Sequence, residues 1–242
     1  MSTITFHNIF AITSFFKKGW TERGILFAIL LLILILVFYL VGRNRHVIRR
    51  RKELRKWAAL NELSFAERID DSALERYAGF TRLSEGHSKT VTNLIYGSWN
   101  RIDLVVFDYD YAKGEANYAT WHCISAVVVD AKVALHPVVI QPSGLWDGWA
   151  VDYGFVGVDF PDDKEFVESF WVSSPEIEWA HEIVTPGMRD YLNRNPNFIL
   201  EFSGNWIMAY RKERFSIEDL DTALKFLEGI LDLLPNSLWE KT

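Results

Sequence analysis

Residues 101–130 read "RIDLVVFDYDYAKGEANYATWHCISAVVVD" and contain two largely apolar runs on either side of a short polar segment. The runs cover residues 101–111 and 118–130, and the segment between them, "AKGEAN", contains the glycine and asparagine that are typical of turns. A third run, residues 91–96, precedes them and is followed by the turn sequence "GSWN". This spacing predicts three consecutive antiparallel strands.

The middle of this stretch, residues 107–123, gathers acidic, aromatic, histidine and cysteine side chains. Side chains alternate between the two faces of a strand, so Asp108 and Asp110 share a face with Leu104 and Val106. A strand becomes polar where it leaves the core, and we therefore expect both carboxylates to face solvent near the turn. The alternative is a binding surface, for which the candidates are Asp108, Asp110, Tyr111, Glu115, Tyr118 and Trp121.

The other expected elements are two short strands, residues 135–142 and 155–160, and three helices, residues 173–184, 185–195 and 216–234. Capping residues and apolar side chains at helical spacing predict the helices. The sequence "NFILEFSGNWIMAYR", residues 197–211, predicts a hairpin that turns at "SGN". A capping-box pattern at residues 72–75 predicts a further short helix. Strands with helices between and after them indicate an α+β domain, with a mainly antiparallel sheet and helices packed on it.

An apolar run precedes this domain. Residues 24–42, "GILFAILLLILILVFYLVG", contain no charged residue, proline, asparagine or glutamine. As a helix the run would be about 28 Å long, close to the hydrocarbon thickness of a bilayer. We therefore predict a single transmembrane helix over residues 24–42, preceded by a short tail over residues 1–23. A basic juxtamembrane helix is expected over residues 43–66, either continuous with the membrane helix or separate, and residues 67–242 form the α+β domain.

The segment after the apolar run is strongly basic, because residues 43–56 carry eight Lys or Arg and one Glu. Basic flanks of a membrane helix stay on the cytoplasmic side, so we expect the large domain in the cytoplasm and the N-terminus outside. Basic side chains close to a membrane also attract anionic headgroups. The side chains expected to make this contact are Arg43, Arg45, Arg49, Arg50, Arg51 and Lys52.

Charge is distributed unevenly along the chain. Residues 1–56 contain eleven Lys or Arg and two Asp or Glu, whereas residues 57–242 contain fifteen and thirty. An acidic domain is repelled by nucleic acid, so no nucleic-acid partner is expected. The chain has one cysteine, which excludes an intrachain disulfide.

The sequence predicts no catalytic residue, no metal site and no cofactor. His122 and Cys123 are adjacent, so on a strand they point to opposite faces and cannot easily share one ion or form a catalytic pair. Residues counted from Asp108 do not follow the spacing of a calcium-binding loop. The sequence also contains no nucleophile elbow, phosphate-binding loop or zinc-protease motif.

A second aromatic segment, "GLWDGWAVDYGF", covers residues 144–155. Its Trp146 and Trp149 either anchor a loop on the core or, if they are exposed, mark a recognition site. We therefore include both tryptophans among the candidate binding residues.

Several short sequences carry a resemblance to a known group of proteins: "FDYDYAKG" at residues 107–114, "LHPVVIQP" at 135–142, and the run from "TPGMRDYL" to "WIMAYR" at 185–211. With these the chain resembles a widespread family of bacterial membrane-anchored proteins that has no assigned activity. The family pattern has Leu-Pro-x-Phe, whereas this chain has His136 between the leucine and the proline, and Val139 in place of the phenylalanine. The resemblance implies a single-pass protein of the bacterial inner membrane and transfers no catalytic residue.

Together these features favour a membrane-tethered, non-catalytic domain that binds an unknown protein partner or serves as a scaffold at the inner face of the membrane. Two alternatives remain open. One is a membrane-associated enzyme of hydrolase type, for which the residues to follow are Asp108, Asp110, His122 and His136. The other is a module that binds an amphiphile or lipid in an aromatic-lined cavity.

Overall fold

The computed structural model describes residues 5–68, 75–115, 118–145 and 153–240, without the side chains of residues 5–23, 40–44, 46 and 240. The chain divides into two compact units, residues 1–52 and 53–242. The capping-box pattern at residues 72–75 and the tryptophans at 146 and 149 lie largely or wholly outside the described residues.

One long helix, α1 (Thr5–Leu60), begins in the first unit and ends in the second. The expected tail is therefore helical from Thr5 onward, and the juxtamembrane helix is continuous with the apolar run. Every side chain from residue 24 to residue 39 is exposed. Among the residues whose side chains are described, no helix combines the length and the hydropathy needed to cross a membrane. The transmembrane helix expected over residues 24–42 therefore stays a prediction.

The second unit contains a seven-stranded sheet in which every strand pairing is antiparallel. The strands are β1 (Ser64–Arg68), β2 (His87–Trp99), β3 (Ile102–Lys113), β4 (Thr120–Pro142), β5 (Val156–Val158), β6 (Phe170–Ser174) and β7 (Ile199–Arg211). Their order is β1-β2-β3-β4-β6-β5, and β7 pairs with the other edge of β4. The predicted meander is confirmed by β2, β3 and β4, and in its middle Asp110 lies opposite Cys123.

Strand β4 is longer than expected because it joins two predicted strands. Residues 118–130 and 135–142 were expected as separate elements, but pairing with β7 continues through both. The register shifts between Asp130 and Leu135 and again between Leu135 and Val138. Pro137 lies in this irregular part of the strand, where its missing N–H does not break a regular ladder.

The predicted hairpin over residues 197–211 is wrong, because this segment forms the single strand β7 along β4. Gly204, at the expected turn, has a φ of +60° and pairs with Leu135 at the register shift. A glycine with positive φ is compatible with a turn or a bulge, and the long partner strand decides in favour of the bulge.

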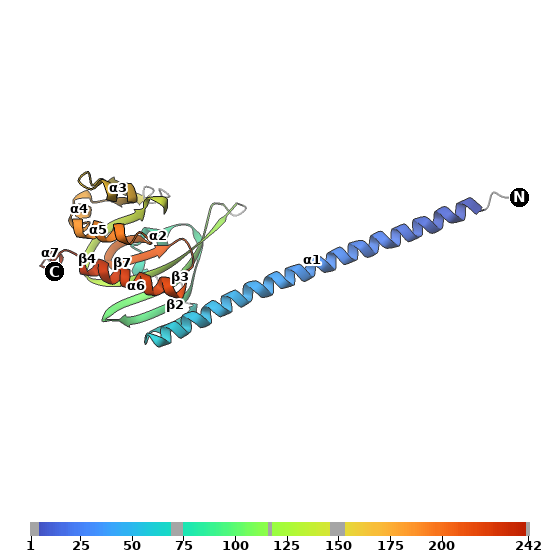
Figure 1. Ribbon diagram of the computed structural model, residues 1–242, viewed down its shortest axis with the longest axis horizontal. Helices are drawn as coiled ribbons and strands as arrows, with labels where there is room; N and C mark the ends of the chain where they lie inside the picture. The colour runs from blue at the N-terminus through green and yellow to red at the C-terminus, as the bar shows by residue number, and fades with distance from the viewer. Residues whose placement is uncertain (1–4, 69–74, 116–117, 146–152, 241–242) are drawn as a thin grey trace. The chain divides into compact units, whose positions relative to one another are not determined.

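Helices cover one face of the sheet, and Figure 1 shows α3 to α6 grouped on one side of it. They are α3 (Lys164–Ser169), α4 (Ile177–Ile183), α5 (Pro186–Arg194), α6 (Ile217–Asp232) and α7 (Ser237–Glu240). Helix α6 confirms the helix predicted from residue 216, and the structure adds a capping box between Ser216 and Asp219. Helix α5 also follows the prediction, with Thr185 as its N-cap. Helix α4 begins four residues later than expected, because the strand β6 extends to Ser174.

The end of α1 also belongs to this core. Leu54, Trp57 and Ala58 are buried, and the Trp57 indole N–H donates to Asp221 of α6 at 2.9 Å. Strand β1 begins at Ser64, in place of the helix expected up to residue 66. The part of the basic segment after residue 52 is thus built into the domain.

The opposite face of the sheet is covered by a short segment, residues 75–85, which we call the strap. It contains a 3₁₀ turn at residues 75–77 and the helix α2 (Thr81–Ser84). Tyr77, Phe80 and Leu83 of the strap pack in a second apolar cluster with sheet residues such as Phe107 and Tyr109. Because both faces are covered, β3 is buried on both sides along most of its length.

Candidate functional site

A groove of about 730 Å³ lies beside the strap, on the face of the sheet opposite α6. Its walls come from the 3₁₀ turn and from β2, β3, β4 and β7. The register places Tyr96 of β2 opposite Val105 of β3, and Asp130 of β4 opposite Trp206 of β7. The groove therefore crosses four strands.

The floor of the groove is aromatic and aliphatic. The rings of Tyr77 and Trp206 meet edge to face, with centroids 4.9 Å apart. Leu94 and Val105 extend this apolar surface. Tyr77 is buried, and burial raises the pKa of its phenol despite the hydrogen bond from Arg76. Tyr96 stands at the edge with 46% of its surface exposed.

The rim of the groove is charged. Lys132 bridges two of its carboxylates, with Nζ 2.5 Å from Asp103 and 2.8 Å from Asp130. The hydrogen bond and the charge of Lys132 lower the pKa of Asp103, and the two carboxylates raise the pKa of Lys132 to about 12. Lys132 has a φ of +60°, and its N–H donates to the Asp130 side chain at 2.8 Å. The bulge in β4 therefore turns the lysine back over the rim.

Beneath the strap lies a second polar cluster, centred on Arg82, which is 1% exposed. Its guanidinium donates to the Tyr210 hydroxyl at 3.0 Å and to Glu85 at 2.5 Å. The Tyr111 hydroxyl donates to the same Glu85 carboxylate at 3.1 Å. Burial alone would raise the pKa of Glu85, but Lys113 and Arg82 lower it. These contacts join the strap to β3 and β7.

The carboxyl group of Glu201, on β7, ties down the other side of the strap. Thr81 donates both its backbone N–H and its hydroxyl to Oε1, each at 2.6 Å. The side chain is fully enclosed, and burial raises its pKa to about 7 although Thr81 and Arg82 act in the opposite direction. The strap is therefore fixed by buried polar contacts as well as by its apolar side chains.

The two aspartates selected from the sequence do not face solvent together. Asp108 is 3% exposed and accepts hydrogen bonds from Asn93, at 2.8 Å, and from the Ser125 hydroxyl. Arg214 lies 3.6 Å from Asp108 and forms a closer ion pair with Asp110. The expectation of a solvent-facing strand end is wrong for Asp108, because the connection from β7 to α6 folds back over it.

The remaining candidates on this hairpin differ in exposure. Tyr111 is buried, as part of the Arg82 cluster, whereas Tyr118 is 86% exposed and Trp121 is 65% exposed. Trp146 and Trp149 lie outside the described residues. In the basic segment the side chain of Arg43 is also outside them, and the other five are exposed or half-buried: Arg45, Arg49, Arg50, Arg51 and Lys52.

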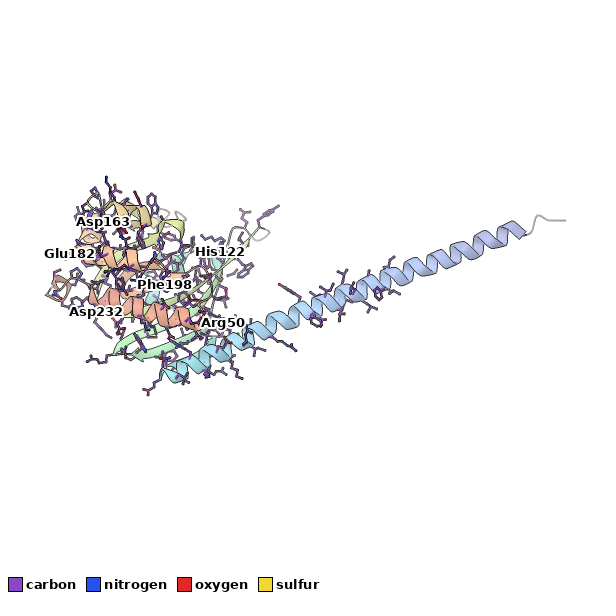
Figure 2. All side chains as sticks on the ribbon, viewed as in Figure 1. Arg50, His122, Asp163, Glu182, Phe198 and Asp232 are labelled. Carbon is purple, nitrogen blue, oxygen red and sulfur yellow. The ribbon has the colours of Figure 1, made fainter. Side chains whose placement is uncertain are left out.

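The residues that the hydrolase alternative requires do not lie together in one site. His122, seen at the β3–β4 hairpin in Figure 2, stacks on Tyr111 at 5.3 Å between ring centroids. Asp110 lies opposite Cys123 in the register, hence on the other face of the sheet from His122. His136 pairs with Glu176 at 2.8 Å. Within the described ranges, no three His, Cys, Asp or Glu side chains are placed to hold a metal ion.

Sequence reasoning missed the groove and the Arg82 cluster. Tyr77, Tyr96, Asp130 and Trp206 are far apart in the chain, and nothing local relates them. Glu201 did carry a signal, because it is a lone acid in the apolar run "FILEF". A charged residue in such a run indicates a buried polar contact.

Comparison with solved structures finds a protein of similar fold. No protein-family model matches the chain, and no curated protein sequence matches it. The crystal structure of the mycobacterial trehalose monomycolate transport factor A, TtfA, is similar, with a TM-score of 0.59 and 19% sequence identity. The match covers 79% of this chain and 97% of that one. At this identity the similarity establishes a shared fold.

Proposed function

We propose that the protein is a membrane-tethered, non-catalytic module that binds a lipid-like amphiphile in the groove beside the strap. The observation that carries this proposal is the composition of the groove: an apolar floor that includes Tyr77 and Trp206, and a rim that carries Arg76, Asp103 and Asp130. An apolar surface with a few polar groups at one side suits a ligand that is itself apolar at one end and polar at the other.

The size of the groove agrees with this role. Its volume of about 730 Å³ lies within the range of roughly 300–1,000 Å³ that is typical of small-molecule sites. The groove is formed by neighbouring strands and by the strap, whose hydrogen bonds with β3 and β7 hold it in place. The site is therefore largely preformed.

The structural relative points in the same direction. It is described as a transport factor for trehalose monomycolate, a lipid, and it shares the fold over most of both chains. The bacterial membrane-anchored family that the sequence resembles is also compatible with a tethered, non-enzymatic module.

The membrane tether is supported by residues 24–42 and the basic segment after them. The described side chains from residue 24 to residue 39 are exposed, for example Phe27 at 71% and Phe38 at 77%. A continuous apolar surface of this kind requires a lipid or protein cover. We infer that it lies in the bacterial inner membrane, with the second unit in the cytoplasm and residues 43–56 at the anionic surface.

The amphiphile proposal can be tested without choosing a lipid in advance. Bacteria producing the full chain are fed a diazirine-bearing fatty acid, irradiated, and the labelled peptides of the protein are mapped by mass spectrometry. We expect labels on peptides that contain Tyr96 or Trp206, reduced several-fold in Tyr96→Ala. Trp171→Ala, which removes a half-exposed tryptophan on β6, is the matched control. Labels confined to residues 24–42 would contradict the proposal.

The tether is tested by fractionation of cells that produce the full chain. We expect the protein in the membrane fraction, resistant to extraction at alkaline pH. Release by alkali would indicate surface attachment only, and recovery in the soluble fraction would exclude the tether.

A protein partner is a second candidate function, favoured by the exposure of Tyr118 and Trp121 at the β3–β4 hairpin. Exposed Tyr and Trp side chains are enriched at the centres of protein interfaces. Cross-linking in cells, followed by purification, should recover a partner with the unaltered chain and less of it with Trp121→Ala. Equal recovery with both would argue against this surface.

A further inference from the structure

The geometry points to an uncharged, polyhydroxylated headgroup as the polar part of the ligand, held at the rim by Asp103, Asp130 and Arg76. This inference rests on the proposed function, since it concerns the ligand of the same groove. It follows from three properties of the groove: the charges at its rim, the hydrogen-bonding groups there, and its aromatic rings.

The charges at the rim disfavour an ionic headgroup of either sign. The groove is lined by the carboxylates of Glu75, Asp103 and Asp130, which would repel a phosphate or sulfate group. The guanidinium of Arg76 and the ammonium of Lys132 stand among them and would repel a quaternary ammonium group. Repulsion of competing ligands by like charges is a general source of specificity.

The same groups suit hydroxyl groups. Asp103 and Asp130 are already neutralised in part by Lys132, so their charge does not require a cationic ligand. Each carboxylate nonetheless has about four lone-pair sites, and each can accept further hydrogen bonds from O–H donors. Arg76 can donate to hydroxyl oxygens from the same side. Neighbouring hydroxyl groups of one ligand can donate to the carboxylates and accept from Arg76 at the same time.

The aromatic rings provide the complementary surface. Tyr96 is half-exposed at one edge of the groove, and Trp206 lies on the same face, opposite Asp130. The face of an aromatic ring carries partial negative charge and attracts the weakly positive C–H groups of a sugar ring. Leu94 and Tyr77 lie deeper and would contact the hydrocarbon part of the ligand.

The test compares four photoreactive lipids that share one diazirine-bearing acyl chain and differ in headgroup: a glycosyl diacylglycerol, a phosphatidylcholine, a phosphatidylglycerol and a cationic trimethylammonium lipid. The full chain is reconstituted in phosphatidylcholine vesicles with a trace of each probe. We expect the glycolipid to label peptides of the groove about fivefold more than the other three lipids do. This ratio corresponds to the net free energy of about one hydrogen bond.

Two substitutions of one exposed residue sharpen the comparison. Asp103→Ala should reduce labelling by the glycolipid and leave labelling by phosphatidylcholine unchanged. Asp103→Lys should in addition raise labelling by phosphatidylglycerol. Asp159→Ala, an exposed aspartate after β5, is the matched control and should change none of these values.

The outcomes separate the two proposals. Equal labelling of the groove by all four lipids, or a preference for the anionic or cationic probe, would overturn the inference on the headgroup and leave the amphiphile site standing. Labelling of the groove by none of them, with labels on residues 24–42 as the positive control, would overturn the proposed function itself.

Discussion

The two faces of the sheet are closed in different ways. The face under α4, α5 and α6 is sealed by aliphatic and phenylalanine side chains, and residues such as Phe198, Leu227 and Ile230 are almost inaccessible to solvent. Among the described residues, the other face is covered by the strap together with Leu145 and Phe155; the strap depends on buried Arg82 and Glu201 and leaves a groove beside it. A broad helical layer stabilises the fold, whereas a narrow cover leaves room for a ligand.

The largest effect is expected on the sealed face. Phe198, labelled in Figure 2, packs against the rings of Phe215 and Phe226 and is 1% exposed. Phe198→Ala should lower the free energy of unfolding by about 4 kcal/mol, because it removes apolar contacts and leaves a cavity. Urea denaturation of the full chain measures this. A loss below about 1 kcal/mol would show that this face is not the main source of stability.

A somewhat smaller effect is expected at Arg82. Arg82→Met removes the guanidinium and leaves the buried Glu85 carboxylate with fewer partners, which should cost about 3 kcal/mol. Adding Glu85→Gln should restore part of the loss, since the buried side chain then carries no charge that needs Arg82. The urea midpoints of the single and double variants give the coupling free energy between Arg82 and Glu85. Strictly additive losses would mean that the two side chains do not act as a pair.

Glu201 makes stability depend on pH. Its pKa is about 7 in the folded chain and about 4.5 in the unfolded chain, so the folded state holds a proton that the unfolded state releases between these values. The free energy of unfolding should therefore fall as pH rises from 4.5 to 7, by on the order of 3 kcal/mol in total.

The measurement is the urea midpoint between pH 5 and 8 for the unaltered chain and for Glu201→Gln. The variant should lose most of the downward slope with pH. Glu115→Gln, which changes an exposed carboxyl group, is the control and should keep the slope. Parallel pH profiles for all three chains would show that Glu201 does not titrate in this range.

The smallest effect on stability is expected in the groove. Tyr96 is half-exposed, so Tyr96→Ala should change the free energy of unfolding by only about 0.5 kcal/mol. The same variant should reduce lipid labelling of the groove several-fold. If both stability and labelling were lost, the groove would be part of the structural core, and the contrast between the two faces would fail.

Local signals explain which parts of the fold could be predicted. The β2–β3–β4 meander follows from apolar runs and the turn sequence between them, and α6 follows from Ser216 at its start and its apolar side chains at helical spacing. The hairpin at residues 203–205 was wrong because a glycine there permits two conformations, and only the long partner strand selects one. The prediction that Asp108 faces solvent is wrong because Arg214, which covers it, is distant in sequence and no local pattern relates the two residues.

The sequence by itself determined the α+β class, the antiparallel strands of the meander, helix α6, and the division into an apolar, basic N-terminal part and an acidic domain. These depend on the periodicity and charge of neighbouring residues. The tertiary structure alone decided that the strap closes one face, that Arg82 and Glu201 are buried beneath it, and that Tyr77, Tyr96, Asp130 and Trp206 line one groove. Those residues lie on separate elements, and they come together because a twisted sheet and its bulges bring distant strands into register.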